Sequence, residues 1–173
     1  MYNAVDLSAD TIMLSAETAS GLYPFESANM QRKISITAES LLNYKELSNK
    51  LCDIKNNSSD NAIANAVNIA ALTLNAKLII SFLENEKDKI AYLISKTRPI
   101  CPIIAVSDKK NSILKSSIYW GVYGCLVDNL DCDCKSDIID KIVKDLNIKS
   151  KEPIIIIKKN KDKENIIKIV YSK

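Results

Sequence analysis

Residues 78–106 read LIISFLENEKDKIAYLISKTRPICPIIAV, and the pattern of this stretch decides the fold. It opens and closes on short apolar runs, 78–82 and 102–106, that show no polar alternation. Such runs are typical of strands that are buried on both faces, as in parallel sheets. Between them, residues 87–96 carry apolar side chains at helical spacing. The stretch therefore predicts a strand–helix–strand unit of an α/β protein.

The alternation of helices and strands continues on both sides of this stretch. It begins with a helix that Ser58 or Ser59 can cap. The turn before the last strand is too short for a crossover helix, so that strand is predicted to pair antiparallel at the sheet edge. The expected fold is a mainly parallel five-stranded sheet with helices on both faces. Beyond the opening stretch, its elements are helices at 109–118 and 136–146 and strands at 122–127, 153–157 and 166–171.

The first part of the chain is organised differently. Residues 11–14 form an apolar run that predicts a short strand, and a loop follows it. Pro24 suits the first turn of a helix, and apolar residues at helical spacing extend that helix to about Leu47. The polar stretch 52–59 is the expected linker. We therefore divide the chain into a first part, residues 1–52, and an α/β domain, residues 59–173.

Composition excludes several classes of function. The 173 residues carry a net charge of +3, and their Lys residues are interleaved with acidic ones, so no nucleic-acid partner is expected. No apolar run reaches the length of a membrane span, and no secretory signal is recognisable, so we expect no membrane partner and a cytoplasmic location. The chain has no His, which excludes a Ser–His or Cys–His hydrolase within it.

The five cysteines are expected to be reduced thiols. Cys132 and Cys134 form the only close pair, but a structural zinc site usually needs four ligands, so we interpret them as incidental thiols of a polar loop. Trp120 is the single tryptophan. It can stack on a ligand or anchor a core or an interface, and we favour the anchor.

Residues 3–24, NAVDLSADTIMLSAETASGLYP, closely resemble the pyruvate kinase run NAVLDGADxVMLSGETAxGxYP, without a gap. Weaker resemblances follow in the family's order at 74–79, at 98–106 (RPICPIIAV beside RPxxPIIAVT) and at 120–123 (WGVY beside WGVxP). The resemblance implies the last strand, loop and helix of a catalytic (β/α)8 barrel, followed by the family's C-terminal α/β domain.

The resemblance also implies a reaction, phosphoryl transfer from phosphoenolpyruvate to ADP, giving pyruvate and ATP. The full enzyme uses Mg²⁺ and K⁺, and its catalytic residues lie on earlier barrel strands that have no counterpart here. The chain alone is therefore expected to bind neither metal and to be inactive. Ser15, Glu17 and Thr18 belong to the loop beside the active site, where they either shape the loop by local hydrogen bonds or contact the substrate and its cations. Ala16 replaces a family Gly and would be strained at positive φ.

In the family, the C-terminal domain binds a sugar-phosphate activator in a hydroxyl-rich turn after its first strand. A Gly-rich loop between the last two strands completes that site. The corresponding turn here offers Asn85, Lys87 and Lys89 as phosphate candidates, while Asp88 adds a negative charge that the two lysines can partly compensate. The second loop, 158–165, has no Gly and is interpreted as a solvated charged turn. The resemblance thus implies a weak or absent response to fructose bisphosphate.

Two functions remain in competition. In the first, the chain is part of a pyruvate kinase, and its partner is the rest of the catalytic barrel. In the second, it is a stand-alone, non-catalytic regulatory or oligomerisation module. The family forms tetramers through its edge strand, which implies a homo-oligomer through residues 166–171. An unrelated nucleotide-binding protein is disfavoured, because no G-x-G-x-x-G or P-loop pattern occurs. Whether Met1 is a true start stays open.

Overall fold

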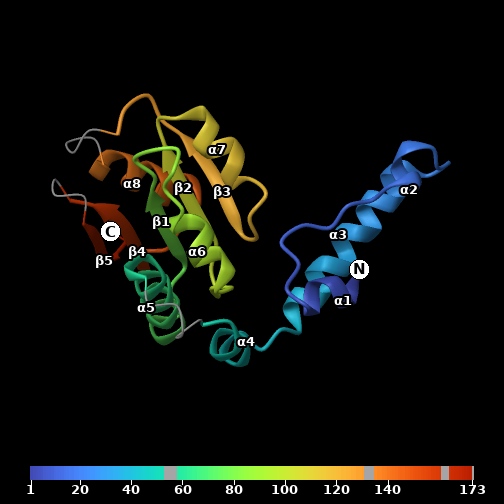
Figure 1. Ribbon diagram of the computed structural model, residues 1–173, viewed down its shortest axis with the longest axis horizontal. Coiled ribbons are helices and arrows are strands. Elements are labelled where there is room, and N and C mark those ends of the chain that lie inside the picture. The colour runs from blue at the N-terminus through green and yellow to red at the C-terminus, as the bar shows by residue number, and fades with distance from the viewer. Residues whose placement is uncertain (53–57, 131–134, 161–163, 173) are drawn as a thin grey trace. The chain divides into compact units, whose positions relative to one another are not determined.

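The computed structural model describes residues 1–52, 58–130, 135–160 and 164–172. They pack into two compact units, Met1–Asn43 and Tyr44–Lys173, and Figure 1 shows the elements of each. The second unit contains the sheet. The first consists of two short helices and one long helix, joined by irregular segments.

The sheet of the second unit has the strand order β3-β2-β1-β4-β5. The central strand β1 pairs in parallel with both β2 and β4, and β2 pairs in parallel with β3. Only β5 runs antiparallel, as the partner of β4 at one edge. The predicted sheet, with its antiparallel last strand, is therefore confirmed. Its strands are β1 Leu78–Phe82, β2 Ile103–Ser107, β3 Val122–Leu126, β4 Pro153–Lys159 and β5 Asn165–Tyr171.

Helices cover both faces of the sheet, as the continuous apolar runs required (Figure 1). On one face, α5 and α6 pack on Ile79, Ile103 and Ile155. On the other face, α8 packs on Ile80 and Ile156. Alternate residues of each inner strand thus enter different cores. The helices of this unit are α4 Tyr44–Leu51, α5 Ser59–Leu74, α6 Ile90–Lys96, α7 Lys110–Ser116 and α8 Lys135–Asp145.

Side chains fix both ends of α5. At its start, the backbone N–H of Asn61 donates to Ser58 Oγ at 3.2 Å, so Ser58 is the cap, one of the two residues that the sequence offered. At its end, Asn75 adopts the left-handed conformation with φ 52°, which Asn tolerates better than most residues. The chain can therefore turn directly from α5 into β1.

Helix α4 is attached to the second unit by buried polar and aromatic contacts. Asn68 of α5 is fully buried, and its Nδ2 donates to Ser48 Oγ at 2.9 Å and to the carbonyl of Thr97 at 2.8 Å. The ring of Tyr44 lies 6.4 Å from that of Trp120, centre to centre. Trp120 thus anchors a helix, in line with the interpretation that the sequence favoured.

The first unit contains α1 Tyr2–Asp6, α2 Ala16–Ala19 and α3 Pro24–Ser40. The strand predicted at 11–14 is wrong for this structure, because residues 11–15 have no regular secondary structure. A strand needs a neighbour for its backbone groups, and the described residues of this unit offer none. Instead, Gln31 Nε2 of α3 donates to the carbonyl of Ile12 at 2.8 Å.

The single helix predicted from Pro24 to about Leu47 is also wrong, because α3 ends at Ser40 and α4 begins at Tyr44. Asn43, a residue type that favours helix starts, directly precedes α4. The contacts of α4 place it in the second unit, so compact packing divides the chain between residues 43 and 44. The predicted linker 52–59 lies partly outside the described residues, and the proposed domain limits stay a prediction.

We predict that Ile155→Ala destabilises the second unit strongly. Ile155 lies in β4 and is fully buried, so truncation leaves a cavity and should lower the free energy of unfolding by about 2 to 5 kcal/mol. Ile169→Ala on β5 is the matched control, because Ile169 is 45% exposed and its truncation should cost roughly 0.5 kcal/mol. Urea unfolding measures both. Equal losses would contradict the assignment of Ile155 to the core.

Candidate functional site

The loop that was predicted to lie beside an active site is held by its own hydrogen bonds. Ser15 N donates to Glu17 Oε2 at 3.0 Å, and Thr18 Oγ1 donates to the carbonyl of Ser15 at 3.3 Å. Backbone N–H groups, first that of Glu17 and then that of Ser15, lower the pKa of the Glu17 carboxyl. All three side chains are exposed. The bonds fit the interpretation of local loop shaping, and direct contact with a substrate stays a prediction.

The replacement of a family Gly by Ala16 causes no strain here, because Ala16 begins the short helix α2 and does not have positive φ. The glycine that matters in this loop is Gly21. A Cβ added there would lie 2.5 Å from the carbonyl oxygen of Glu17, closer than atoms can pack. The turn from α2 toward α3 therefore needs a residue without a side chain.

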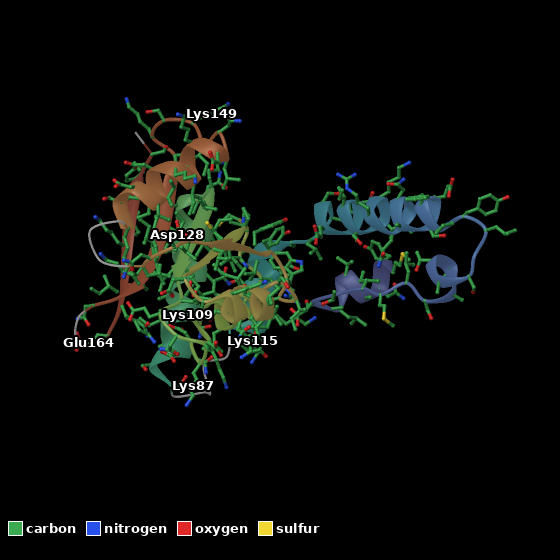
Figure 2. All side chains as sticks on the ribbon, turned by 90° about the horizontal axis from the view of Figure 1, so that it is seen from above. Lys87, Lys109, Lys115, Asp128, Lys149 and Glu164 are labelled. Carbon is green, nitrogen blue, oxygen red and sulfur yellow. The ribbon has the colours of Figure 1, made fainter. Side chains whose placement is uncertain are left out.

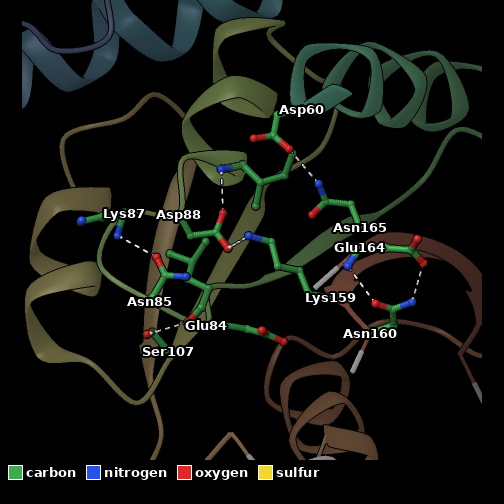
Figure 3. A network of polar contacts seen from close by, with 12 residues as sticks. Asp60, Glu84, Asn85, Lys87, Asp88, Ser107, Lys159, Asn160, Glu164 and Asn165 are labelled. Carbon is green, nitrogen blue, oxygen red and sulfur yellow. Dashed lines mark hydrogen bonds and ion pairs between the residues drawn. The ribbon is translucent and has the colours of Figure 1, made fainter. Parts of the chain in front are cut away.

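The second candidate site lies at the carboxyl ends of β1 and β4. The helices that follow β1 and precede β4 cover opposite faces of the sheet, since α6 packs into one core and α8 into the other. In open α/β sheets, ligands bind outside the carboxyl ends of the strands at such a change of face. The strand order thus indicates a possible ligand site at the connection between β1 and α6, residues 83–89. Figure 3 shows this connection from close by.

An ion pair between the chain's own groups occupies this position. Asp88 Oδ2 lies 3.0 Å from Lys159 Nζ at the end of β4, and the Asp88 side chain is only 3% exposed (Figure 3). Its other oxygen, Oδ1, accepts a hydrogen bond from the backbone N–H of Ile90 at 3.2 Å. Oδ1 thus has a hydrogen-bond partner, whereas the buried Oδ2 has the Lys159 ammonium beside it as an ion-pair partner but accepts no hydrogen bond from the described residues.

A second ion pair ties the same connection to α8. Lys135 Nζ lies 3.5 Å from Glu84 Oε1, and its side chain is only 9% exposed. The ammonium also lies 5.6 Å from the ring centre of Phe82, which a cation–π contact allows. We call the four charged residues Glu84, Asp88, Lys135 and Lys159 the strand-end network. It contains two ammonium and two carboxylate groups, so its formal charges sum to zero.

The predicted phosphate candidates do not form this network. Lys87 and Lys89 are exposed, and neither makes an ion pair with any residue that the structure describes. Asn85 Oδ1 accepts a hydrogen bond from Lys87 N at 2.9 Å and so shapes the turn (Figure 3). The ion-pair partner of Asp88 is therefore neither Lys87 nor Lys89, and their part in compensating its charge for a phosphate stays a prediction. The lysine that pairs with Asp88 comes from β4, which neighbours β1 in the sheet.

The described residues at the two ends of the connection between β4 and β5 make hydrogen bonds of their own. Asn160 Nδ2 donates to Glu164 Oε2, and Glu164 N donates to Asn160 Oδ1, both at 2.8 Å. Asn165 Nδ2 donates to Asp60 Oδ1 of α5 at 2.8 Å. Lys159, which the sequence placed in a solvated turn, is a half-buried strand residue with a carboxylate partner. Only the knowledge that β4 neighbours β1 could have identified it.

Burial disfavours the thiolate form of two of the described cysteines. Burial raises the pKa of Cys101 to about 12 and, to a smaller degree, raises that of Cys125. Both are therefore protonated near neutral pH, when a nucleophile would need a thiolate. Cys132 and Cys134, which the sequence singled out, lie outside the described residues. Among the described helices, none is both long and apolar enough to cross a lipid bilayer.

Comparison with known proteins gives one consistent family. A family model described as the alpha/beta domain of pyruvate kinase matches residues 61–170. The curated pyruvate kinases of Sporosarcina psychrophila and Staphylococcus aureus (strain USA300) are 36% and 40% identical to the chain over 121 and 120 residues. These matches cover 70% and 69% of the chain but only 20% of each relative, so the chain spans about a fifth of their length.

Solved structures extend the similarity over nearly all of the chain. A crystal structure of a Cryptosporidium parvum pyruvate kinase superposes with a TM-score of 0.89 at 29% identity and covers 99% of this chain and 35% of that one. A structure of the enzyme from the same organism in complex with ADP gives a TM-score of 0.87 at 30% identity. The similarity therefore includes the first unit as well as the sheet.

We predict strong energetic coupling between Asp88 and Lys159. Lys159→Met leaves a buried carboxylate without its partner and should lower the free energy of unfolding by about 3 kcal/mol. In a double-mutant cycle with Asp88→Asn, measured by urea unfolding, the coupling energy should be about 1 to 3 kcal/mol.

The exposed pair Lys109–Asp108 is the control for this cycle. Its charged atoms are as close, at 3.1 Å, but its side chains are 53% and 23% exposed, and a cycle of Lys109→Met with Asp108→Asn should give less than about 1 kcal/mol. A coupling as small between Asp88 and Lys159 would contradict a buried network.

Proposed function

Because the chain belongs to the pyruvate kinase family and corresponds to its C-terminal portion, we propose that it works as part of a pyruvate kinase. The proposed reaction transfers a phosphoryl group from phosphoenolpyruvate to ADP and yields pyruvate and ATP. In this proposal, the remaining barrel supplies the catalytic residues. This chain supplies the end of the barrel and the α/β domain.

The observation that supports this proposal is the exposure of apolar side chains on the first unit. Only Val5 and Ala38 are buried among its hydrophobic residues. A stable unit does not leave so many large apolar groups in water, and such surfaces are typical of sites that another protein segment covers. The mostly exposed ones are Leu7, Met13, Leu22, Tyr23, Phe25 and Leu41, each with at least 66% of its surface accessible.

The composition of residues 11–14 favours the rest of a barrel as the partner that covers these apolar side chains. Residues 11–14 have the composition of a strand but lie without one beside them. The rest of a (β/α)8 barrel would offer a neighbouring strand on each side and would close the sheet. In that setting Ser15, Glu17 and Thr18 would stand at the carboxyl end of the last barrel strand, on the face where barrel enzymes build their active sites.

The cofactors of this reaction belong to the remainder of the proposed enzyme. Among the described residues, no group of three or more His, Cys, Asp or Glu side chains could hold a metal ion. The part of the chain that the structure describes therefore offers no gathered set of oxygen donors of the kind that a Mg²⁺ site needs. In the proposed enzyme Mg²⁺ and K⁺ would be held by the other part of the barrel, and we derive no step through them in this chain.

The edge strand β5 supports a proposed contact between copies of the chain. Its apolar side chains Ile166, Ile169 and Tyr171 are 38%, 45% and 59% exposed. β5 pairs only with β4, so its outer edge offers unpaired backbone groups that a second edge strand can bind. We propose a homo-oligomer through residues 166–171.

The second candidate, a stand-alone regulatory or oligomerisation module, has one observation in its favour. The second unit encloses two cores of its own, and its strand-end network is balanced without any ligand. Such a unit needs no barrel for stability. The exposed apolar side chains of the first unit argue for the enzyme part, because a module of this kind would gain nothing from them.

We predict that the chain alone has no pyruvate kinase activity and that a matching barrel restores it. The barrel is the Cryptosporidium parvum pyruvate kinase shortened by the region that this chain matches. A coupled assay with phosphoenolpyruvate and ADP should show turnover only in the mixture. Phe25→Ser, at a position that is 81% exposed, should weaken the association by about 10- to 150-fold and lower the restored turnover, because burial of Phe is worth about 1.5 to 3 kcal/mol.

The matched control is Ser27→Ala, which removes a hydroxyl bonded only to its own helix, from Oγ to the carbonyl of Tyr23 at 2.8 Å. It should leave the restoration unchanged. Turnover by the chain alone, or a failure of the mixture to associate, would refute the proposal that it is part of a pyruvate kinase.

We predict that Ile169→Lys shifts the chain toward the monomer, because a charge on an edge strand opposes pairing with a second edge. Sedimentation analysis of the purified chain measures the change. Leu146→Lys is the control, since Leu146 is as exposed, at 48%, but lies beyond α8. A monomeric wild type, or an equal effect of both variants, would count against assembly through β5.

A further inference from the structure

A cavity of about 470 Å³ lies at the carboxyl end of the edge strand β3, beside α8. Its walls come from the end of β3, from the residues that follow it, and from α8. None of the four residues of the strand-end network lines it. Figure 2 shows Asp128, one of its lining residues, apart from Lys87, so the cavity is also separate from the connection between β1 and α6. Small-molecule sites have volumes of roughly 300 to 1,000 Å³.

The cavity exists because the core between α8 and the sheet ends at the border of β3. Residues that are opposite each other in the register of two strands lie on the same face of the sheet. Cys125 of β3 is opposite Val106 of β2, and Val106 is a buried member of that core. Tyr123 is opposite the buried Ile104, but it is itself 63% exposed. The face of β3 that continues this core is therefore partly uncovered.

The floor of the cavity is apolar. Ile142 of α8 belongs to the core, and Cys125, Val127 and Ile138 are partly buried and pack against it. Burial raises the pKa of the Cys125 thiol, so this side chain is neutral near neutral pH and adds to the apolar surface. Binding of an apolar group on this floor removes apolar surface from water, which is favourable.

The rim of the cavity carries more negative than positive charge. Asp128 follows β3, while Lys141 and Asp145 lie one helical turn apart on α8. These two carboxylates and one ammonium leave an excess of one negative charge. Neither Asp128 nor Asp145 forms an ion pair with any residue that the structure describes. Lys141 lowers and Asp145 raises the pKa of the Cys125 thiol, against the larger effect of burial, so both charges act at the floor.

We propose that this cavity binds a small organic cation, a molecule with an apolar body and one primary ammonium group. The body covers the apolar floor, and the ammonium lies at the rim, where Asp128 and Asp145 attract it. A neutral molecule of the same shape gains only the contact with the floor, and an anion is repelled by the excess negative charge. The proposal is independent of whether the chain works as part of a pyruvate kinase.

Three probes that differ in the charge of one group test the proposal. They are 2-phenylethylamine, 2-phenylethanol and 3-phenylpropanoate, which share a phenyl ring on a short chain and are cationic, neutral and anionic near neutral pH. The full chain is titrated with each probe at constant ionic strength, and the amide NMR signals of Leu126 and Ile142 are followed. We expect saturable shifts of both signals, with the amine bound about threefold to fivefold more tightly than the alcohol and the carboxylate bound most weakly.

Two substitutions on α8 should change the affinity for the amine in opposite directions. Asp145→Asn removes an attractive charge and should weaken binding about threefold, whereas Lys141→Met removes a repulsive charge and should strengthen it by about the same factor. Asp140→Asn is the comparison variant, because it removes an exposed carboxylate from the same helix that does not line the cavity. It should leave the affinity unchanged.

Three outcomes would overturn the proposal. These are the absence of saturable shifts at Leu126 and Ile142, equal affinity for the three probes, and a loss of affinity in Asp140→Asn as large as that in Asp145→Asn. The last outcome would show that the amine responds to the total charge of the protein and not to this rim. The probe series uses the unchanged chain, so it decides the proposal even if a substitution prevented folding.

Discussion

The position of β1 between β2 and β4 is the constraint on which the rest of the second unit depends. A strand with parallel neighbours on both sides is covered by helices on both faces, so each of the apolar residues of β1 enters one of two cores. This placement brings the end of β4 beside the end of β1. The pairing of Asp88 with Lys159 follows from it, because Lys159 is the last residue of β4 and Asp88 lies in the connection that follows β1.

The strand-end network bears on whether an anion can bind at the ends of β1 and β4. A protein that binds an anion at the ends of its strands leaves cationic groups there without partners. In this chain Glu84 already forms an ion pair with Lys135, and Asp88 forms one with Lys159. The charges are balanced and mostly buried, so an external anion would have to displace a carboxylate that also accepts a backbone hydrogen bond. The expected weak response to a sugar bisphosphate has a physical basis in that competition.

Sequence patterns predicted the sheet because its strands are short apolar runs and its helices are amphipathic, both of which are local signals. They failed at residues 11–14, where the run is apolar but a strand requires a neighbour that the pattern does not contain. They also missed Lys159, since its partner lies far away in sequence and becomes adjacent only through the strand order. The phosphate candidates, such as Lys87, were chosen because they lie in the turn after β1. They lie near the strand-end network but form none of its ion pairs.

The strand order also has a consequence for biosynthesis. β1, β2 and β3 leave the ribosome first and can pair with one another through nearby connections, whereas β4 follows only after β3 and α8. Until then, the second edge of β1 is open and strongly apolar, which is the kind of surface that nascent chains aggregate through. The β4–β5 hairpin closes this edge when it pairs with β1.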